Sequence, residues 1–292
     1  MFENAIKNRY EFVILYDVEN GNPNGDPDAG NMPRIDPETG HGIVTDVCIK
    51  RKIRNYIDMI QEGKPGYDIY IKQDTPLNTQ DKLGVEHVKD IKDKAEKSRG
   101  FRDFMCNHFF DIRAFGAVMT TAAKDKELSN VAGQVRGPIQ LAFGRSVDPI
   151  VPQEVTITRV AITTEEKAAS ASTEMGRKHI VPYGLYRQEG FISANLAQKV
   201  TGFSPEDLEL FWNAVVHMFE EDRSAARGKM TLRELIIFKH ESELGNAPAH
   251  KLFDLVHVER REGVSTPRSY SDYVVKIDDV ALPNGITLER RG

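Results

Sequence analysis

The sequence predicts an α+β fold, and three observations carry this prediction. Residues 10 to 18 are β-branched and aromatic, which is typical of a β-strand. Residues 45 to 61 place isoleucines at helical spacing behind Thr45, a suitable N-cap. Ser204-Pro-Glu-Asp207 opens a second helix, with serine at the N-cap and proline at the first helical position. Strands follow each helix and no internal repeat is found, which indicates α+β organisation.

The other elements are expected from local patterns of hydrophobic residues. Strands are predicted at 67–73, 111–118, 134–147, 152–163, 180–193, 233–240, 250–259 and 270–278. The stretch 82–110 mixes charged and aromatic residues and is expected to be mostly helical. The helix after Ser204 should bury Leu208, Phe211, Trp212, Val215 and Phe219 and stop at Gly228.

One segment does not fit a compact body. Between Val155 and Ile162 the apolar residues change phase at Arg159, which indicates either a bulge or a strand that leaves the sheet. Residues 163 to 174 are small and polar, with nothing to bury. We therefore expect a long hairpin with a projecting tip and positive charge on its returning side.

Composition excludes several classes of protein. The 292 residues are 40% hydrophobic and 28% charged, as in ordinary soluble domains, and form one elaborated domain or two. No stretch is apolar enough to span a bilayer, and the first residues lack a secretory pattern, so no membrane partner is expected. Cys48 and Cys106 form neither a disulfide framework nor a zinc motif, which favours a reducing cytoplasm. The net charge of −5 means that nucleic acid would need a local positive patch.

The first candidate patch is on the helix at 45–61. Lys50, Arg51 and Arg54 are three and four residues apart, so they share a face away from the isoleucines. Such a face suits a phosphate backbone. The alternative is a solvated charged face that is partly paired with Asp58.

The second candidate is the loop at 19–30, which is rich in Gly, Pro, Asn and Asp. Its acidic residues, Asp26 and Asp28 among them, do not match the spacing of a calcium-binding loop, and prolines interrupt it. We therefore expect no metal here, but a loop of Asx turns that holds backbone N–H groups in place. Asn22 and Asn24 are candidate RNA-binding residues in this loop.

Two further groups of residues are candidates for RNA contact. Arg136 and Arg145 lie beside glycines, which allow a ligand backbone to come close, although both could simply lie on a sheet surface. The returning side of the expected hairpin carries Arg177, Lys178 and His179, with Met175 as a wedge between bases. The alternative for this group is a charged loop end.

Motifs for catalysis are missing from the sequence. It contains no GxSxG, HExxH or P-loop motif. Cys48 has basic neighbours but no histidine at helical spacing, and the eight histidines show no metal-ligand pattern. We therefore expect no catalytic residue and no cofactor.

Six motifs occur in a fixed order along nearly the whole chain. They are Asn20-Gly-Asn-Pro-Asn-Gly-Asp26, Thr45-Asp-Val-Cys-Ile-Lys-Arg-Lys-Ile-Arg54, Asp111-Ile-Arg-Ala-Phe-Gly-Ala117, Gly137-Pro-Ile-Gln-Leu-Ala-Phe-Gly-Arg145, Gly176-Arg-Lys-His-Ile-Val-Pro-Tyr-Gly-Leu-Tyr186 and Asp222-Arg-Ser-Ala-Ala-Arg-Gly228. In this order the chain resembles the Cas-seven family, the backbone subunit of the CRISPR Cascade complex, in its type I-C branch.

The resemblance implies one elaborated domain over residues 1–292. Its core would be an RRM-like (ferredoxin-like) palm, with a finger inserted at 62–110 and a thumb hairpin at 152–193. Family members line up head to tail along a guide RNA, and base pairing with target DNA reads the sequence. The implied partners are the guide RNA, target DNA, neighbouring copies of the chain and other Cascade subunits.

Two other functions remain open from the sequence. The chain could be a metal-dependent ribonuclease that uses Asp26, because some relatives in other CRISPR effector types cut RNA with an aspartate in a comparable loop. It could also be an assembly protein that binds no nucleic acid. No general base is paired with Asp26 in the sequence, so the non-catalytic interpretation is preferred.

Overall fold

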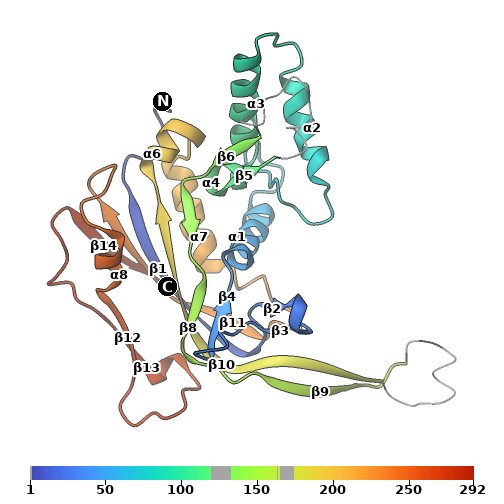
Figure 1. Ribbon diagram of the computed structural model, residues 1–292, viewed down its shortest axis with the longest axis vertical. Coiled ribbons are helices and arrows are strands. Elements are labelled where there is room, and N and C mark those ends of the chain that lie inside the picture. The colour runs from blue at the N-terminus through green and yellow to red at the C-terminus, as the bar shows by residue number, and fades with distance from the viewer. Residues whose placement is uncertain (1, 120–132, 163, 165–173) are drawn as a thin grey trace.

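The computed structural model describes residues 2–119, 133–162, 164 and 174–292 (Figure 1). Within this part of the chain, one large antiparallel sheet has the strand order β14-β11-β1-β10-β8-β4, with β7 and β9 also paired to β10. Its strands are β1 (Tyr10–Gly21), β4 (His41–Val44), β7 (Ile139–Leu141), β8 (Gly144–Pro149), β9 (Gln153–Arg159), β10 (Glu174–Ile192), β11 (Lys229–His240) and β14 (Ile286–Arg291). The fold is therefore α+β, as the sequence predicts.

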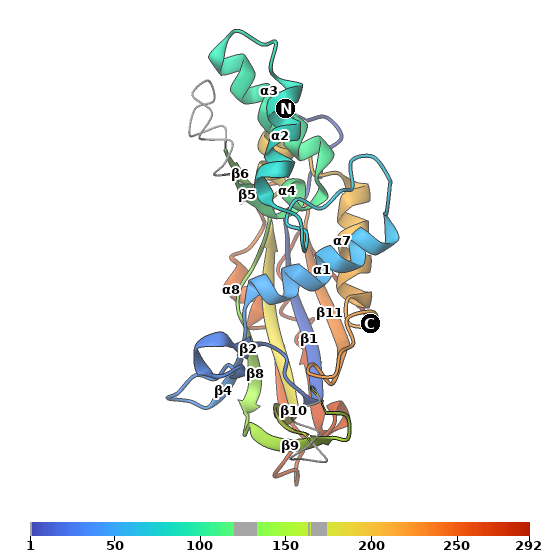
Figure 2. The same ribbon diagram turned by 90° about the vertical axis from the view of Figure 1, so that its right-hand side faces the viewer.

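The sheet is covered on both faces. Helices α1 (Asp46–Ile60) and α7 (Pro205–His217) lie on one face, which Figure 2 shows from the front. Helix α8 (Ala249–Phe253) and the hairpin of β12 (Val256–Arg260) and β13 (Tyr273–Ile277) lie on the other. Central strand β1 sends Phe12, Ile14 and Tyr16 into the first core and Val13 and Leu15 into the second. Burial on both faces explains why this strand reads as a nearly continuous apolar run.

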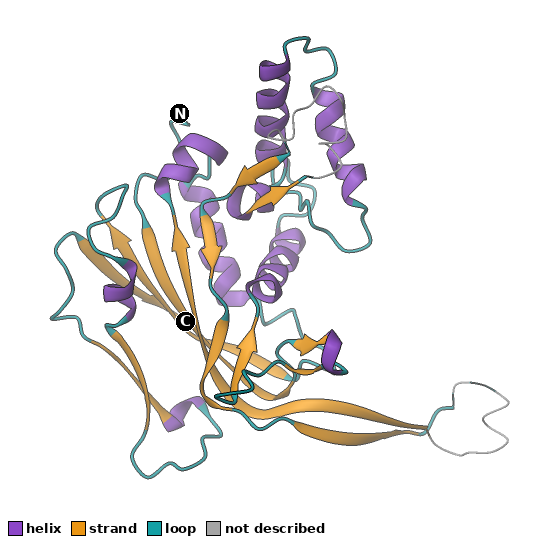
Figure 3. Cartoon of the chain, viewed as in Figure 1, coloured by secondary structure: helices purple, strands orange, loops and turns teal. Residues whose placement is uncertain are grey.

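A helical lobe stands at one end of the sheet (Figure 3). It contains α2 (Leu77–His87), α3 (Lys94–His108), α4 (Phe110–Phe115), β5 (Gly116–Val118) and β6 (Gln134–Arg136). Phe101, Met105 and Phe109 belong to a core cluster of its own. The prediction of a mostly helical stretch at 82–110 is confirmed.

Of two strands predicted next to this lobe, the one at 67–73 is wrong and the one at 111–118 is correct only for its last three residues. Residues 67–73 form no strand, because the backbone N–H groups of Tyr70 and Ile71 donate to Asp111 at 2.7 and 3.1 Å instead of to a neighbouring strand. Residues 110–115 are helical, and extended structure begins at Gly116. The alternation of polar and apolar residues there imitates a strand, yet Asp111 and Arg113 are both buried.

Helix α4 is held by two buried ion pairs. Arg54 of α1 donates from Nε to Asp111 at 2.7 Å. Arg113 forms a two-pronged contact with Asp207 of α7, at 2.7 Å from both Nε and Nη2, and also donates to the Cys106 carbonyl. These contacts fix the helical lobe against both helices of the sheet.

An arm leaves the other end of the sheet. Strand β10 is 19 residues long; Val181–Ile192 pairs with β1, whereas Glu174–Ile180 pairs with β9. All seven residues of β9 are exposed, and the pairing of β9 with β10 has no register shift. Of the two alternatives at Arg159, the structure therefore has the strand leaving the sheet. The expected tip at 163–174 lies outside the described residues, except for Thr164 and the backbone of Glu174.

Two further predictions are corrected, and one strand was missed. Helix α7 ends at His217 and not at Gly228, because residues 222–228 form a turn-rich segment whose Asp222 is paired with Lys52. Pro248 starts the short helix α8 where a strand was expected at 250–259, so β12 begins only at Val256. Edge strand β14 was not predicted. In the described residues, no helix is both long and apolar enough to cross a membrane.

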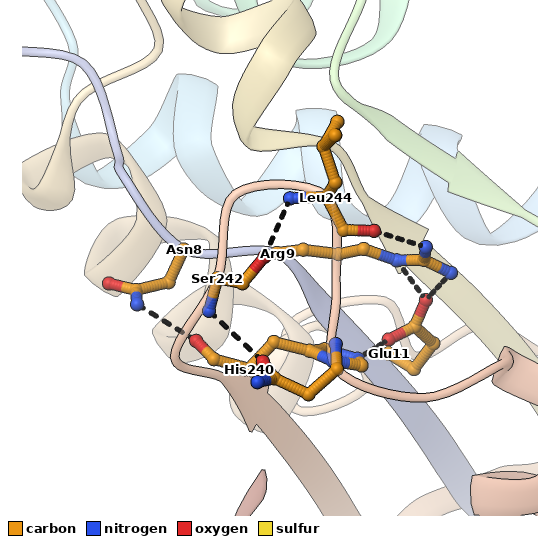
Figure 4. Close-up of polar contacts among 7 residues, drawn as sticks. Asn8, Arg9, Glu11, His240, Ser242 and Leu244 are labelled. Atoms are coloured by element: carbon orange, nitrogen blue, oxygen red, sulfur yellow. Dashed lines mark hydrogen bonds and ion pairs between the residues drawn. The ribbon is translucent and has the colours of Figure 1, made fainter. Parts of the chain in front are cut away.

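A buried polar network closes the end of the sheet nearest the N-terminus (Figure 4). The carboxylate of Glu11 on β1 accepts from Arg9 at 2.6 Å and is paired with His240 on β11. The backbone N–H of Asn246 donates to Nδ1 of His240 at 2.7 Å, which leaves the ring proton on Nε2, facing Glu11. The network thus holds the residues after β11 against the first strand.

We predict that Arg113→Ala lowers the free energy of unfolding by about 3–5 kcal/mol, because it leaves Asp207 as a buried carboxylate without its cation. Urea denaturation would measure the loss. The control is Glu86→Ala, which removes an exposed pair with Lys89 and should change stability by less than about 1 kcal/mol. Equal effects of the two substitutions would contradict the structural role of the buried pair.

Candidate functional site

Four separate segments meet at the end of the sheet from which the arm leaves. They are residues 19–34, residues 45–48 at the start of α1, residues 176–181 of β10 and residues 222–229 before β11; we call this place the loop junction. Within residues 19–34, β2 (Gly25–Asp26), the short helix η1 (Pro27–Ala29) and β3 (Met32–Pro33) form a small folded flap (Figure 1). Most of the sequence motifs singled out above thus lie in or beside one place.

Two glycines allow the segments to cross. A Cβ on Gly21 would lie 1.8 Å from the carbonyl oxygen of Arg227, and a Cβ on Gly228 would lie 2.5 Å from that of Asn20. Next to the crossing, Asn22 N–H donates to the Ala226 carbonyl at 2.9 Å. The backbones therefore touch, and any side chain at either position would separate them.

The two asparagines of the loop have different tasks. Asn24 accepts from the backbone and hydroxyl of Thr45, both at 3.0 Å, so it positions the N-cap of α1. Asn22 is buried and donates to the Asn31 carbonyl at 2.7 Å, but its Oδ1 has no hydrogen-bond partner within the described residues. The same holds for Nε of Arg34, on the same loop. Buried polar atoms without partners are rare, and a bound ligand is one explanation for them.

The cations of α1 do not form the exposed face expected from their spacing. Arg54 is buried and paired with Asp111, so it does not lie on an open face with Lys50 and Arg51, and the alternative of a solvated Arg54 is excluded as well. Arg51 donates to the Ile71 carbonyl at 2.8 Å, and Lys50 pairs with Asp46 at 2.8 Å. Asp58, their expected partner, pairs instead with Lys72. Both remaining side chains are half-buried: Lys50 lies beside the junction and Arg51 beside the helical lobe.

Other cations lie at the junction itself. Lys178 donates to the Ala225 carbonyl at 2.7 Å, which brings one predicted residue against the crossing. Arg223 is mostly exposed, and Arg227 is part-exposed beside Asp222. Arg34 lies 3.4 Å from Asp26. The sequence interpretation missed Arg34, Arg223 and Arg227; the signal for the last two was the 222–228 motif, in which arginines flank small residues.

The remaining predicted residues are spread over the molecule. Arg145 on β8 is exposed and pairs with Asp36 at 3.0 Å, and this hydrogen bond lowers the pKa of the Asp36 carboxyl. Met175 on the arm is 76% exposed, and Arg177 pairs with Glu154 across the arm at 3.2 Å. His179 is half-buried at the base of the arm. Arg136 is exposed on β6 and lies at the opposite end of the sheet, away from the junction.

Two side chains at the junction could carry chemistry, the Cys48 thiol and the Asp26 carboxylate. Burial raises the pKa of the Cys48 thiol, and Lys52 and Arg227 offset this only in part, so the thiol is protonated at neutral pH and is a poor nucleophile. Asp26 accepts from the Asp28 N–H at 3.2 Å and pairs with Arg34, which is the role of an Asx turn. Within the described residues, no group of three His, Cys, Asp or Glu side chains could hold a metal ion.

Comparisons with known proteins agree on one family. Residues 8–278 match the family model described as "CRISPR-associated protein Cas7". A curated protein of Haloferax volcanii with the same description is 30% identical, over 97% of this chain and 83% of that protein. A solved chain described as "CRISPR RNA-guided surveillance complex, pre-nicking" has a TM-score of 0.50 at 14% identity, covering 79% of this chain and 78% of that one. This structural likeness concerns the fold: a mixed α+β chain with a large antiparallel sheet.

We predict that Gly21→Ala opens the loop junction, because its methyl group would push against the Arg227 carbonyl, at a loss of about 1–3 kcal/mol. Trypsin should then cleave faster after Arg223 and Arg227, as followed by mass spectrometry. The control is Gly176→Ala on the arm, where the added Cβ would meet Ile157 at an ordinary 3.5 Å. Unchanged cleavage in Gly21→Ala would mean that the crossing does not hold the segment.

Proposed function

This chain belongs to the CRISPR-associated Cas7 family, and on this premise we propose that it is a guide-RNA-binding backbone subunit of a type I-C Cascade surveillance complex. The observation that carries the proposal is the loop junction. Cations from three distant segments surround a crossing of two backbones, beside two buried polar atoms that have no hydrogen-bond partner among the described residues. A polyanion that passes over this surface would meet both charge and unused hydrogen-bonding groups.

Binding at the junction would be independent of sequence. The surface offers charged side chains and backbone groups, which suit phosphate and ribose. Contacts of this kind do not require the bases to stack on exposed aromatic residues. The guide bases would stay free to pair with target DNA, so base pairing would supply specificity. Other Cascade subunits would complete the complex.

The topology supports an RRM-like palm. Strand β1, helix α1, strands β8 and β10, helix α7 and strand β11 follow one another in the chain, and the sheet order is β11-β1-β10-β8. This is the βαββαβ sequence and the strand order of a ferredoxin-like sheet. On this basis we propose residues 62–110, which include α2 and α3 of the helical lobe, as the finger and the hairpin, 152–193, as the thumb of a single elaborated domain, 1–292.

We predict that Lys178→Ala combined with Arg223→Ala weakens binding of a CRISPR guide transcript by about tenfold and lowers the salt slope by about two. Both side chains contact surface groups of the junction and neither is buried in the core, so the fold should persist. Fluorescence anisotropy across a salt series measures both effects. The control is Lys276→Ala on β13, an exposed lysine far from the junction.

Unrelated RNA sequences should be weakened to the same degree. A loss restricted to one sequence would contradict backbone binding. Binding equal to the wild type would remove the junction as the guide surface.

The arm supports head-to-tail assembly. A two-stranded ribbon is marginally stable in water by itself, yet β9 and β10 extend together for seven residue pairs, which is about 23 Å. On β9, the apolar side chains of Val155 and Ile157 are exposed. A neighbouring copy that covers this ribbon would bury its apolar residues, and repetition of the same contact along RNA gives an open filament.

We predict that replacing residues 156–177 with Asn-Gly removes assembly but spares the fold. The new turn joins Val155 to Lys178, which are already paired across the arm, and Asn-Gly suits a two-residue hairpin. Size-exclusion chromatography with light scattering should show that particle mass no longer grows with guide length. The melting temperature should stay close to that of the wild type. A variant that still forms particles of growing mass would refute the role of the arm.

We propose that the chain is non-catalytic, because the Asp26 carboxylate already caps η1 and pairs with Arg34. Purified protein with Mg²⁺ should leave labelled target RNA intact, and Asp26→Ala should bind guide RNA without a change in cleavage. Metal-dependent cleavage that disappears in Asp26→Ala would establish the ribonuclease function instead.

A further inference from the structure

A cavity of about 500 Å³ lies at the end of the sheet opposite the loop junction, where α3 meets the π-helix η3 (Ala197–Thr201). Arg99 and Arg102 of α3 and Lys199 of η3 line it, together with one carboxylate, Asp103, and the apolar side chains of Phe2 and Val135. Figure 1 shows α3 and the N-terminal end of the chain at this end of the molecule, with the arm at the other. Nothing in the proposed function uses this cavity.

The lining of the cavity carries net positive charge, with three cations against the one carboxylate of Asp103. Within the described residues, Arg99, Arg102 and Lys199 make no ion pair, whereas most other arginines of the sheet and its helices do. Arg99 and Arg102 are one helical turn apart, so they repel each other, and Lys199 adds a third charge from a segment about 100 residues away. Three like charges gathered from two elements are stabilised when an anion binds between them.

The backbone that presents Lys199 is unusual and firmly held. Helix η3 is a π-helix, a rare conformation that often occurs at functional sites. Phe2 N–H donates to the Gln198 carbonyl at 2.9 Å, and the Gln198 side chain donates to the Ile6 carbonyl at 3.2 Å. The N-terminal segment therefore fixes both the wall at Phe2 and the turn that carries Lys199.

We propose that this cavity is a second nucleic-acid site that binds a phosphodiester with its attached nucleoside. Arginine forks match phosphate oxygens, and α3 offers two of them on one face. The volume exceeds that of a single phosphate, and the Phe2 ring and Val135 give an apolar wall against which a sugar or base can lie. The inference rests on the family's proposed nucleic-acid function but concerns a different surface, at the far end of the sheet.

A phosphodiester with its nucleoside can belong to the guide RNA or to DNA, and the experiment distinguishes these two sources. The full-length chain would be titrated with two labelled probes, a CRISPR repeat transcript and a DNA duplex of unrelated sequence, by anisotropy over a salt series. The test variants are Arg99→Glu with Arg102→Glu, and Lys199→Ala. The matched control is Lys82→Glu with Lys92→Glu, two exposed lysines of the same lobe with the same change in charge.

The double variant should weaken one probe by at least about tenfold and lower its salt slope by about two. Lys199→Ala should weaken the same probe by about threefold, and the control should retain most of the affinity. Loss for the transcript identifies the guide as the source, and loss for the duplex identifies DNA.

Two results would overturn the inference. One is that neither probe is weakened beyond the control. The other is that both probes bind normally while guide-dependent particles become smaller, which would assign the cavity to an acidic protein surface. If the wild-type protein binds the transcript normally, either of these results leaves the proposed function intact. If the wild-type protein does not bind the transcript, the proposed function itself is refuted.

Discussion

Two buried ion pairs on the short helix α4 fix the relation between the helical lobe and the sheet. Asp111 is paired with Arg54 of α1, and Arg113 is paired with Asp207 of α7, so two positions of α4 that are two residues apart reach both helices on this face of the sheet. A charge left alone in such a place is strongly destabilising, whereas a fully paired one is tolerated. The two pairs therefore set the position of α4 relative to α1 and α7, because each buried carboxylate must lie against its cation.

This connection also determines what α1 can do. Its middle is committed to the interior through Arg54 and to Asp222 through Lys52, so these two cations join separate segments of the chain. Its first residues, capped by Thr45 and positioned by Asn24, face the loop junction. For the proposed function, the same pairing reconciles a net charge of −5 with nucleic-acid binding: acids neutralise the structural cations, and the few that stay accessible are grouped locally.

The sequence predicts most elements because their patterns are local. The strand at 10–18, the helices behind Thr45 and Ser204, and the outward path of β9 all follow from spacing, capping or a change of phase. The failures around Asp111 and Arg54 share one cause, which is long-range pairing. Nothing near Asp111 reveals that it accepts from Tyr70 and Arg54, and nothing near Arg54 reveals that it is buried. For the site, the glycines of the 19–30 loop were visible, but their contact with Arg227 depends on a segment 200 residues away.

Strand β10 belongs to the sheet and to the arm at once, and this restricts how the arm can change in evolution. Successive side chains of a strand point to opposite faces, so the insertion of one residue in β10 would exchange the two faces of everything beyond it. The faces of β9 and β10 stay in place only when both strands change together, in steps of two residues, or about 7 Å of length for each step. Homologues should therefore differ in arm length by such paired increments, and in the filament proposed above the spacing between copies would change with them.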